Sequence, residues 1–412
     1  MDLSSLDGLE KEPGVLLPEL SRHVSDNPTI LEIRRANKWL EQNAASLVSG
    51  LPRVRVAVVT EQTLEGLRDP FILFARLAGF AVDLLVCPPY FPEMQFMSPT
   101  SELVEHRPDI TFVFFDIEKR SAFTSRGLDD QVFSEFATRL DQAVGAMSRF
   151  AQRTGSKIVV ANFIAIWPPL ALLKETDPRW GRVSFLQRAN DRLHERCTVA
   201  GLQVLPLNSH LANWGYRRCI DVREYCNTDT AFTAEGFNRI ARLIAAQLSE
   251  QFQPRRTLLI IDPEGALWGR SADVESMEVA YSPDNYPGRM FHRAMKWMQE
   301  AASTGVRLAL AARVERAQLS SLLERPDFLL HPDQFSAIIS TDEPVTAKIS
   351  RILLELGVSP EQAVFLSSNQ DDCESARRES LGLATVAVPS NLGEYLVALA
   401  SIPCLGRRTQ SF

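Results

Sequence analysis

The sequence contains no apolar run long enough to cross a membrane, and its start does not resemble an export signal. A membrane-spanning helix needs about 18 to 20 consecutive, mostly apolar residues, and no run in the 412 residues approaches that length. The opening segment, MDLSSLDGLEKEPG, carries acids where a signal peptide needs cations. We therefore expect a cytoplasmic protein with no membrane partner.

Zinc-ligand patterns and excess positive charge are also lacking. The six cysteines form no CxxC pair, and no two of the six histidines lie four residues apart, which disfavours a structural zinc site. In a reducing cytosol we expect the cysteines to be free thiols. The formal net charge of −7 argues against nucleic acid as a partner, because basic surfaces bind phosphate backbones.

The composition is that of a globular protein, with 45% hydrophobic and 23% charged residues. A chain of 412 residues is too long for one hydrophobic core, so at least two domains are expected. Residues 1–50 contain apolar residues at helical spacing and predict a helical extension. Two segments of alternating character follow, 51–253 and 254–412, and the short linker QPRR (253–256) spans the boundary.

This alternation predicts the fold class. Strand-like segments such as RVRVAVV (53–59) and LLII (258–261) are mostly or wholly apolar, and segments with a helical period, such as 234–252, lie between them. Strands that are apolar on both faces belong to parallel sheets covered by helices on both sides. We predict two three-layer α/β domains with mostly parallel sheets, preceded by the helical extension.

The segment LLIIDPEGALWGR, residues 258–270, has the form of a catalytic strand. Asp262 follows four apolar residues, where an α/β enzyme places a nucleophile, and Glu264 comes two residues later. In a haloacid-dehalogenase-type phosphatase the first acid attacks phosphorus and the second protonates the leaving oxygen. Magnesium, held by the first acid and by acids at a later strand end, offsets the phosphate charge.

Residues from about 30 to 400 resemble the FkbH-like family. The resemblance rests on LWG at 267–269, on EP at 343–344 and on the spacing of FLSSN at 365–369. It implies an SGNH-hydrolase-like domain over 51–253 and a haloacid-dehalogenase-like (HAD-like) domain over 254–412. It also implies transfer of a glyceryl unit from a phosphorylated glycerate to an acyl carrier protein during polyketide assembly.

The catalytic and metal-binding positions of the family are altered in the second domain. The family motif LDLDNTLWGG reads IDPEGALWGR here, which keeps Asp262 as the candidate nucleophile and Glu264 as the candidate acid. The closing family motif FIDDN reads FLSSN, so Ser367 and Ser368 replace both metal-binding aspartates. We therefore expect no cofactor and no metal site, with magnesium binding weak or lost.

The phosphate-binding positions are altered as well. By the resemblance, Ala312 or a neighbour takes the hydroxyl position and Val345 takes the lysine position. Lys348, three residues further along, can face the same side of a helix. Arg270 and Arg313 follow strands and are candidates for binding an anionic substrate. The alternative for both arginines is a solvent-facing position in a loop.

The first domain departs from the SGNH-like pattern in a similar way. After the first strand, Glu61 or Gln62 occupies the nucleophile position, and neither side chain can form a thioester. In the segment that resembles a DxxH motif, Asp229 stands at the acid position and Phe232 at the histidine position. Asn162 matches the oxyanion asparagine of the family and is a candidate hydrogen-bond donor.

Other groups are weaker candidates in the first domain. Cys87 ends a strand, Cys219 and Cys226 flank DVREY, and each could carry an acyl group as a thiol. His210 follows a strand and is the one histidine placed to reach the expected cleft. Strand-end cysteines and loop histidines are more often packing residues.

Three functional hypotheses follow from these patterns. The chain either binds an acyl carrier protein or its acyl group after losing phosphatase and glyceryl-transfer chemistry, or performs altered acyl-transfer or other chemistry in the retained clefts. Alternatively it is a non-catalytic partner of an active relative, in a homo- or hetero-oligomer. We favour the first hypothesis, a pseudoenzyme with two degenerate sites, because the changes affect both domains together.

Overall fold

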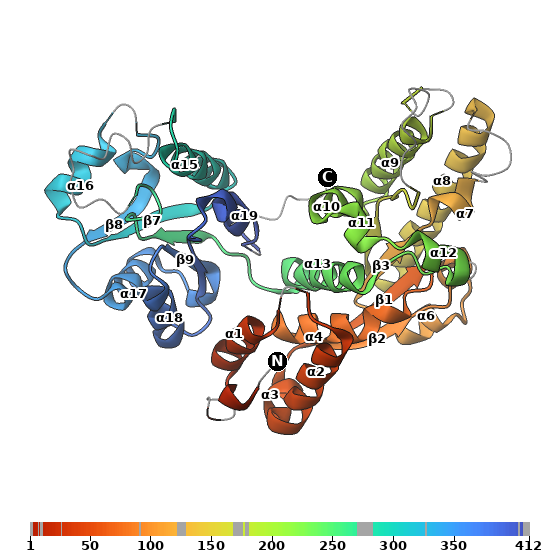
Figure 1. Ribbon diagram of the computed structural model, residues 1–412, viewed down its shortest axis with the longest axis horizontal. Coiled ribbons are helices and arrows are strands. Elements are labelled where there is room, and N and C mark those ends of the chain that lie inside the picture. Colours follow the sequence, from red (N-terminus) through yellow and green to blue (C-terminus); the bar gives the residue numbers. More distant parts are fainter. Residues whose placement is uncertain are drawn as a thin grey trace. The chain divides into compact units, whose positions relative to one another are not determined.

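A computed structural model describes residues 3–406 except 7, 9–10, 26, 90–91, 122–128, 168–175, 178–180, 270–282, 326–327 and 403. It contains two compact units, one made mainly of Leu17–Gln247 and the other mainly of Leu248–Thr409. Each unit holds a five-stranded sheet with helices on its faces (Figure 1). Every strand pairing is parallel, which confirms the predicted α/β fold class.

The N-terminal extension is helical, as predicted. It contains α1 (Pro13–His23), α2 (Ile30–Asn43) and α3 (Ala45–Gly50). A capping box starts α2, in which the Glu32 amide donates to Thr29 Oγ1 at 3.3 Å and the Thr29 amide donates to Glu32 Oε2 at 2.8 Å.

The first sheet has the strand order β2-β1-β3-β4-β5. Its strands are β1 (Arg53–Thr60), β2 (Ala81–Val86), β3 (Ile110–Phe114), β4 (Lys157–Ala161) and β5 (Gln203–Leu205). Thr60 pairs with Phe114 in the register of β1 and β3. The residues after these two strands therefore meet at the carboxyl edge of the sheet.

Ten α-helices follow the N-terminal extension up to Phe252 among the described residues. They are α4 (Arg68–Leu77), α5 (Pro92–Met97), α6 (Glu102–His106), α7 (Ile117–Ser121), α8 (Asp130–Thr154), α9 (Arg182–Val199), α10 (Leu207–Trp214), α11 (Tyr216–Cys219), α12 (Val222–Thr228) and α13 (Ala234–Phe252). Between one sheet face and helices α8 and α9, Phe136 packs edge-on against Phe163 and Phe185, with ring centroids 5.4 Å apart in both pairs. No described helix has the length and apolar composition needed to span a membrane.

The second sheet has the order β10-β9-β6-β7-β8. Its strands are β6 (Leu258–Ile261), β7 (Arg307–Ala312), β8 (Phe335–Ser340), β9 (Ala363–Ser367) and β10 (Ala384–Ala387). The helices of this unit are α15 (Gly288–Ser303), α16 (Arg316–Leu323), α17 (Val345–Leu356), α18 (Gln370–Glu379) and α19 (Tyr395–Ala400).

Strand β6 lies at the centre of the second sheet and is buried on both faces. Leu259 and Ile261 belong to the core shared with α15 and α19, whereas Leu258 and Ile260 belong to the core shared with α17 and α18 (Figure 1). Ile261 pairs with Leu366 of β9 and with a residue of β7. Asp262 is thereby held at the carboxyl edge, beside the end of β9.

Candidate functional site

Asp262 is a buried carboxylate at the end of the central strand of the second unit. Its backbone amide donates to the Leu366 carbonyl at 2.8 Å, and its Oδ2 accepts a hydrogen bond from Ser367 Oγ at 2.7 Å. Its Oδ1 is buried and has no hydrogen-bond partner among the described residues. Burial raises the pKa of Asp262 to about 6, against the opposing effects of Ser367 and Arg313.

The two serines at the positions where the FkbH-like resemblance expects aspartates form defined hydrogen bonds. Ser367 donates to the Asp262 carboxylate, and Ser368 donates to the backbone carbonyl of Glu264 at 2.9 Å. The Asn369 amide donates in turn to Ser367 Oγ at 3.0 Å. These serine protons point at oxygens that would otherwise be available to a cation.

Protein sites for magnesium commonly use one or two carboxylates together with waters and substrate phosphates. At this edge the carboxylate of Asp262 has one oxygen hydrogen-bonded to Ser367, and serines stand at both positions where the resemblance expects the metal-binding aspartates. The described part of the chain contains no group of three His, Cys, Asp or Glu side chains that could hold a metal. Asp371 and Asp372 lie in the first turn of α18, and Asp372 forms an ion pair with Arg313. The site therefore does not fit the magnesium ion that the family resemblance implies.

Lys348 reaches the edge of the sheet from within α17. The residue is fully buried, and its Nζ donates to the Ala312 carbonyl at 2.7 Å, at the end of β7. Burial lowers the pKa of Lys348, and the nearby carboxylate of Asp262 opposes that change. Val345, at the lysine position of the family, is buried at the start of the same helix. The ammonium group of Lys348 thus lies near Asp262. Lys348 is three residues after Val345, the position where the resemblance expects the lysine.

Of the two arginines that are candidates for binding an anionic substrate, the structure describes Arg313. Arg313 follows β7, its side chain is 48% exposed, and it is paired with Asp372. Arg270 lies outside the described residues. Arg313 borders a hollow of about 410 Å³ whose lining includes the acids Asp342, Glu343, Asp372 and Glu379. This hollow carries more negative than positive charge, which opposes the binding of a phosphate.

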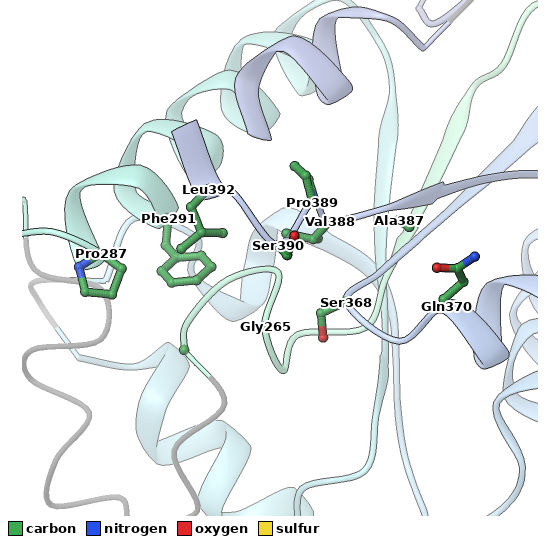
Figure 2. A pocket seen from close by; sticks show the side chains of 11 residues that line it. Gly265, Pro287, Phe291, Ser368, Gln370, Ala387, Val388, Pro389, Ser390 and Leu392 are labelled. Carbon is green, nitrogen blue, oxygen red and sulfur yellow. The ribbon is translucent and has the colours of Figure 1, made fainter. Parts of the chain in front are cut away.

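A second pocket, of about 550 Å³, opens beside the ends of β9 and β10 (Figure 2). Its described lining residues are Gly265, Gly269, Pro287, Phe291, Ser368, Gln370, Ala387, Val388, Pro389, Ser390 and Leu392. None of these side chains is charged. The pocket includes Ser368, which links it to the hydrogen bonds around Asp262, and sequence reasoning did not identify it.

In the first unit, the residues after β1 and β3 form a buried polar network. The Asp116 amide donates to Glu61 Oε2 at 2.7 Å, and Arg120 Nε donates to the same oxygen at 2.9 Å. Arg120 also contacts Glu93 at 2.6 Å and is only 5% exposed. Burial raises the pKa of Glu61, and the charge of Arg120 opposes this rise.

Asp116 is the second carboxylate of this network and was not predicted. Its Oδ2 accepts from Tyr225 Oη at 2.9 Å and from Gln62 Nε2 at 3.3 Å. The signal was present in the sequence, since DITFVFFD (109–116) ends in an acid just as LLIID does. Gln62, which with Glu61 is one of the two candidates for the nucleophile position, is therefore a hydrogen-bond donor to a buried carboxylate.

The other predicted residues of the first unit have structural contacts. Asp229 caps the end of α12 with a φ of 58° and pairs with Lys119 at 3.0 Å. Phe232 is buried and packs on a neighbouring phenylalanine. Asn162 Oδ1 accepts from the Asn208 amide at 2.8 Å, so its oxygen holds the start of α10.

The structure also shows the surroundings of the candidate cysteines and of His210. Cys87 and Cys219 are buried, Cys226 is exposed, and all six cysteines are free. Burial raises the pKa of Cys87 to about 12, which makes it a poor nucleophile. Burial lowers the pKa of His210, whose ring stacks on Trp214 with centroids 5.4 Å apart.

No protein-family model matches the sequence, and a search of curated proteins finds no match. Among solved structures, the chain is similar to the N-terminal part of the protein BF1531 from Bacteroides fragilis, which contains a phosphatase domain and was crystallised with magnesium. The identity is 18% and the TM-score 0.78, over 90% of this chain and 98% of that chain.

Two other solved structures match one part of the chain each. The lipase/acylhydrolase from Enterococcus faecalis is 12% identical over 50% of this chain and 100% of that chain, with a TM-score of 0.33. The L-2-haloacid dehalogenase from Xanthobacter autotrophicus is 18% identical over 35% of this chain and 83% of that chain, with a TM-score of 0.23. From the BF1531 match we conclude that this chain has a two-domain α/β architecture shared with a phosphatase-containing protein.

Proposed function

We propose that this chain is a divergent FkbH-like protein that binds an acyl carrier protein or its acyl group and no longer performs magnesium-dependent phosphoryl or glyceryl transfer. The sequence resemblance and the two-domain fold support the assignment to this type of protein. The observation that carries the loss of chemistry is the pair of hydrogen bonds from Ser367 to Asp262 and from Ser368 to the Glu264 carbonyl.

Phosphoryl transfer depends on positive charge that neutralises the phosphate oxygens as the nucleophile approaches. A serine hydroxyl contributes a hydrogen bond but no charge. Lys348 is bound to the Ala312 carbonyl and Arg313 to Asp372, so each nearby cation already has a partner. An ionised Asp262 would therefore meet a phosphate with little compensation for their mutual repulsion.

The first unit supports the same proposal. Acyl transfer through a covalent intermediate needs a nucleophile and a base in hydrogen-bond reach of each other. Of the two residues at the expected nucleophile position, Gln62 donates to Asp116 and Glu61 accepts from Arg120, and neither can form a thioester. The buried Phe232 stands where the base is expected and cannot take up a proton.

Mass spectrometry tests the proposal. The protein is mixed with an acyl phosphate of glycerate, MgCl2 and a holo-acyl carrier protein, and intact masses are measured under denaturing and native conditions. We expect a non-covalent complex with the carrier and no glyceryl adduct beyond a control without the protein. An adduct on the carrier would overturn the loss of chemistry, and the absence of a complex would overturn carrier binding.

One observation favours a second candidate function, an enzyme of different chemistry. The buried Asp262 has an unpartnered Oδ1 and a pKa of about 6, which suits a general base near neutral pH. Turnover of uncharged acyl esters without metal, with a rate that rises through about pH 6 and disappears in Asp262→Asn, would support this candidate. A flat profile, or turnover that persists in the variant, would exclude it.

A further inference from the structure

The pocket beside the ends of β9 and β10, whose described lining residues are uncharged, has two chemically different ends. Figure 2 shows Pro287, Phe291 and Leu392 on one side, and Ser368 and Gln370 on the other. The loop through Gly265 runs between them. The volume of about 550 Å³ lies within the range of roughly 300 to 1,000 Å³ that is typical of small-molecule sites.

The lining determines the charge that a ligand can carry. A phosphate or carboxylate that entered the pocket would lose water without meeting an opposite charge among the described lining residues. Arg313 and Asp372, which lie at the same edge of the sheet, line the other hollow and not this pocket. An uncharged ligand avoids this cost.

The distribution of side chains determines the shape of the ligand. Pro287 and Leu392 are partly exposed and offer apolar surface to a hydrocarbon group, with the buried Phe291 packed behind them. Figure 2 places the Gln370 amide away from them. One N–H of this amide donates to Glu374 Oε1 at 3.4 Å, and its carbonyl oxygen and second N–H are the groups it offers a ligand. The exposed Ser390 adds a hydroxyl at the rim. A hydrocarbon segment joined to a carbonyl or amide group matches this arrangement.

We propose that this pocket binds an uncharged acyl derivative, with its hydrocarbon part against Phe291, Pro287 and Leu392 and its carbonyl end toward Gln370. The neutral, two-ended character of the ligand follows from the lining, while the choice of an acyl group rests on the proposed function. The pocket thus selects acyl units that lack a phosphate or a carboxylate.

The test uses two probes that differ in one charged group. S-butyryl-N-acetylcysteamine is uncharged, whereas S-succinyl-N-acetylcysteamine carries a terminal carboxylate on a chain of the same length. Titration calorimetry on the full chain measures both affinities at about neutral pH. We expect the butyryl probe to bind at least roughly tenfold more tightly, a difference of about 1.4 kcal/mol. Equal affinities, or no binding of the butyryl probe, would overturn the proposal.

Two matched variants locate the binding site. Ser390 is exposed at the pocket, so Ser390→Trp obstructs it without entering the core. Ser401 is also exposed and follows α19 outside the lining, which makes Ser401→Trp the control. We expect Ser390→Trp to weaken butyryl binding at least roughly tenfold and Ser401→Trp to leave it unchanged. Gln370→Ala, at a second exposed position, should weaken binding in the same direction.

The outcomes separate this proposal from carrier binding. Unchanged affinity in both Ser390→Trp and Gln370→Ala would overturn the pocket as the site, as would an equal loss in Ser401→Trp. The probes contain no carrier protein, so carrier binding without probe binding overturns only the pocket. Probe binding without carrier binding overturns only the proposed partner.

Discussion

Replacing Asp262 by asparagine should stabilise the second unit at neutral and alkaline pH. The pKa of this carboxyl rises from an ordinary 3.8 to about 6 in the fold, mainly because of burial. Each pKa unit corresponds to about 1.4 kcal/mol, so keeping the carboxylate ionised costs the folded state about 3 kcal/mol. The asparagine side chain has nearly the same shape and no charge to desolvate.

This cost is a net value. The pKa of about 6 already includes the opposing effects of the Ser367 hydrogen bond and of the nearby charges. We therefore expect a net stabilisation of about 3 kcal/mol. A change of that size raises the melting temperature of a unit of this size by about 6 to 12 °C.

The stability difference between the wild type and Asp262→Asn should depend on pH in a defined direction. Because the pKa in the fold is above the ordinary value, the wild type is most stable with Asp262 protonated and loses that stability as the pH rises through about 6. Calorimetric melting of the wild type and Asp262→Asn should therefore show a large difference at about pH 8 that disappears near pH 4. Asp371→Asn, at an exposed position in the first turn of α18, is the control and should be slightly destabilising. A difference that does not depend on pH, or a less stable Asp262→Asn at about pH 8, would refute the reasoning.

Three further predictions concern the metal, the buried ion pair and the thiols. Ser367→Asp returns an acid to the edge of the sheet, so millimolar MgCl2 should raise the melting temperature of this variant and leave that of the wild type unchanged; equal responses would contradict the role given to the serine hydroxyl. Arg120→Met should lower the free energy of unfolding in urea by about 3 to 5 kcal/mol, whereas Arg34→Met, which removes an exposed ion pair, should change it by less than about 1 kcal/mol; similar losses would refute the difference in burial. Iodoacetamide at mildly alkaline pH should modify the exposed Cys226 and spare Cys87, whose pKa burial raises to about 12; comparable labelling in peptide mass spectra would contradict this.

The fold was predictable because its signals are local. The period of apolar residues placed α13 at 234–252, where the structure has Ala234–Phe252, and apolar runs marked the strands on both sheets. The mostly apolar segment LQVLPLN (202–208) predicts a single strand from its sequence, but β5 ends at Leu205 and α10 begins at Leu207. Pro206 lies between them and has no amide proton to donate to a strand ladder.

The candidate sites were predictable only in part, because their contacts join distant segments. The sequence marked Asp262 and the two serines, but the bond between Ser367 and Asp262 spans 105 residues and depends on the pairing of β9 with β6. The bond between Arg120 and Glu61 spans 59 residues. The pocket around Phe291 and Ser390 has no sequence signal, since a cavity arises from packing and not from residue type.

The buried network of the first unit has a consequence for local unfolding. Loops at the carboxyl edge of a sheet are commonly among the first segments to open. Here the Asp116 amide proton is bound by Glu61 Oε2, and the Lys119 ammonium is bound by the Glu61 carbonyl at 2.7 Å. Opening this edge would break these hydrogen bonds at the same time as the bond from Arg120 to Glu61. The Asp116 amide should therefore exchange with deuterium as slowly as the amides of the strands. The edge of the sheet that a hydrolase leaves free for its substrate would then be among the last parts of this unit to open.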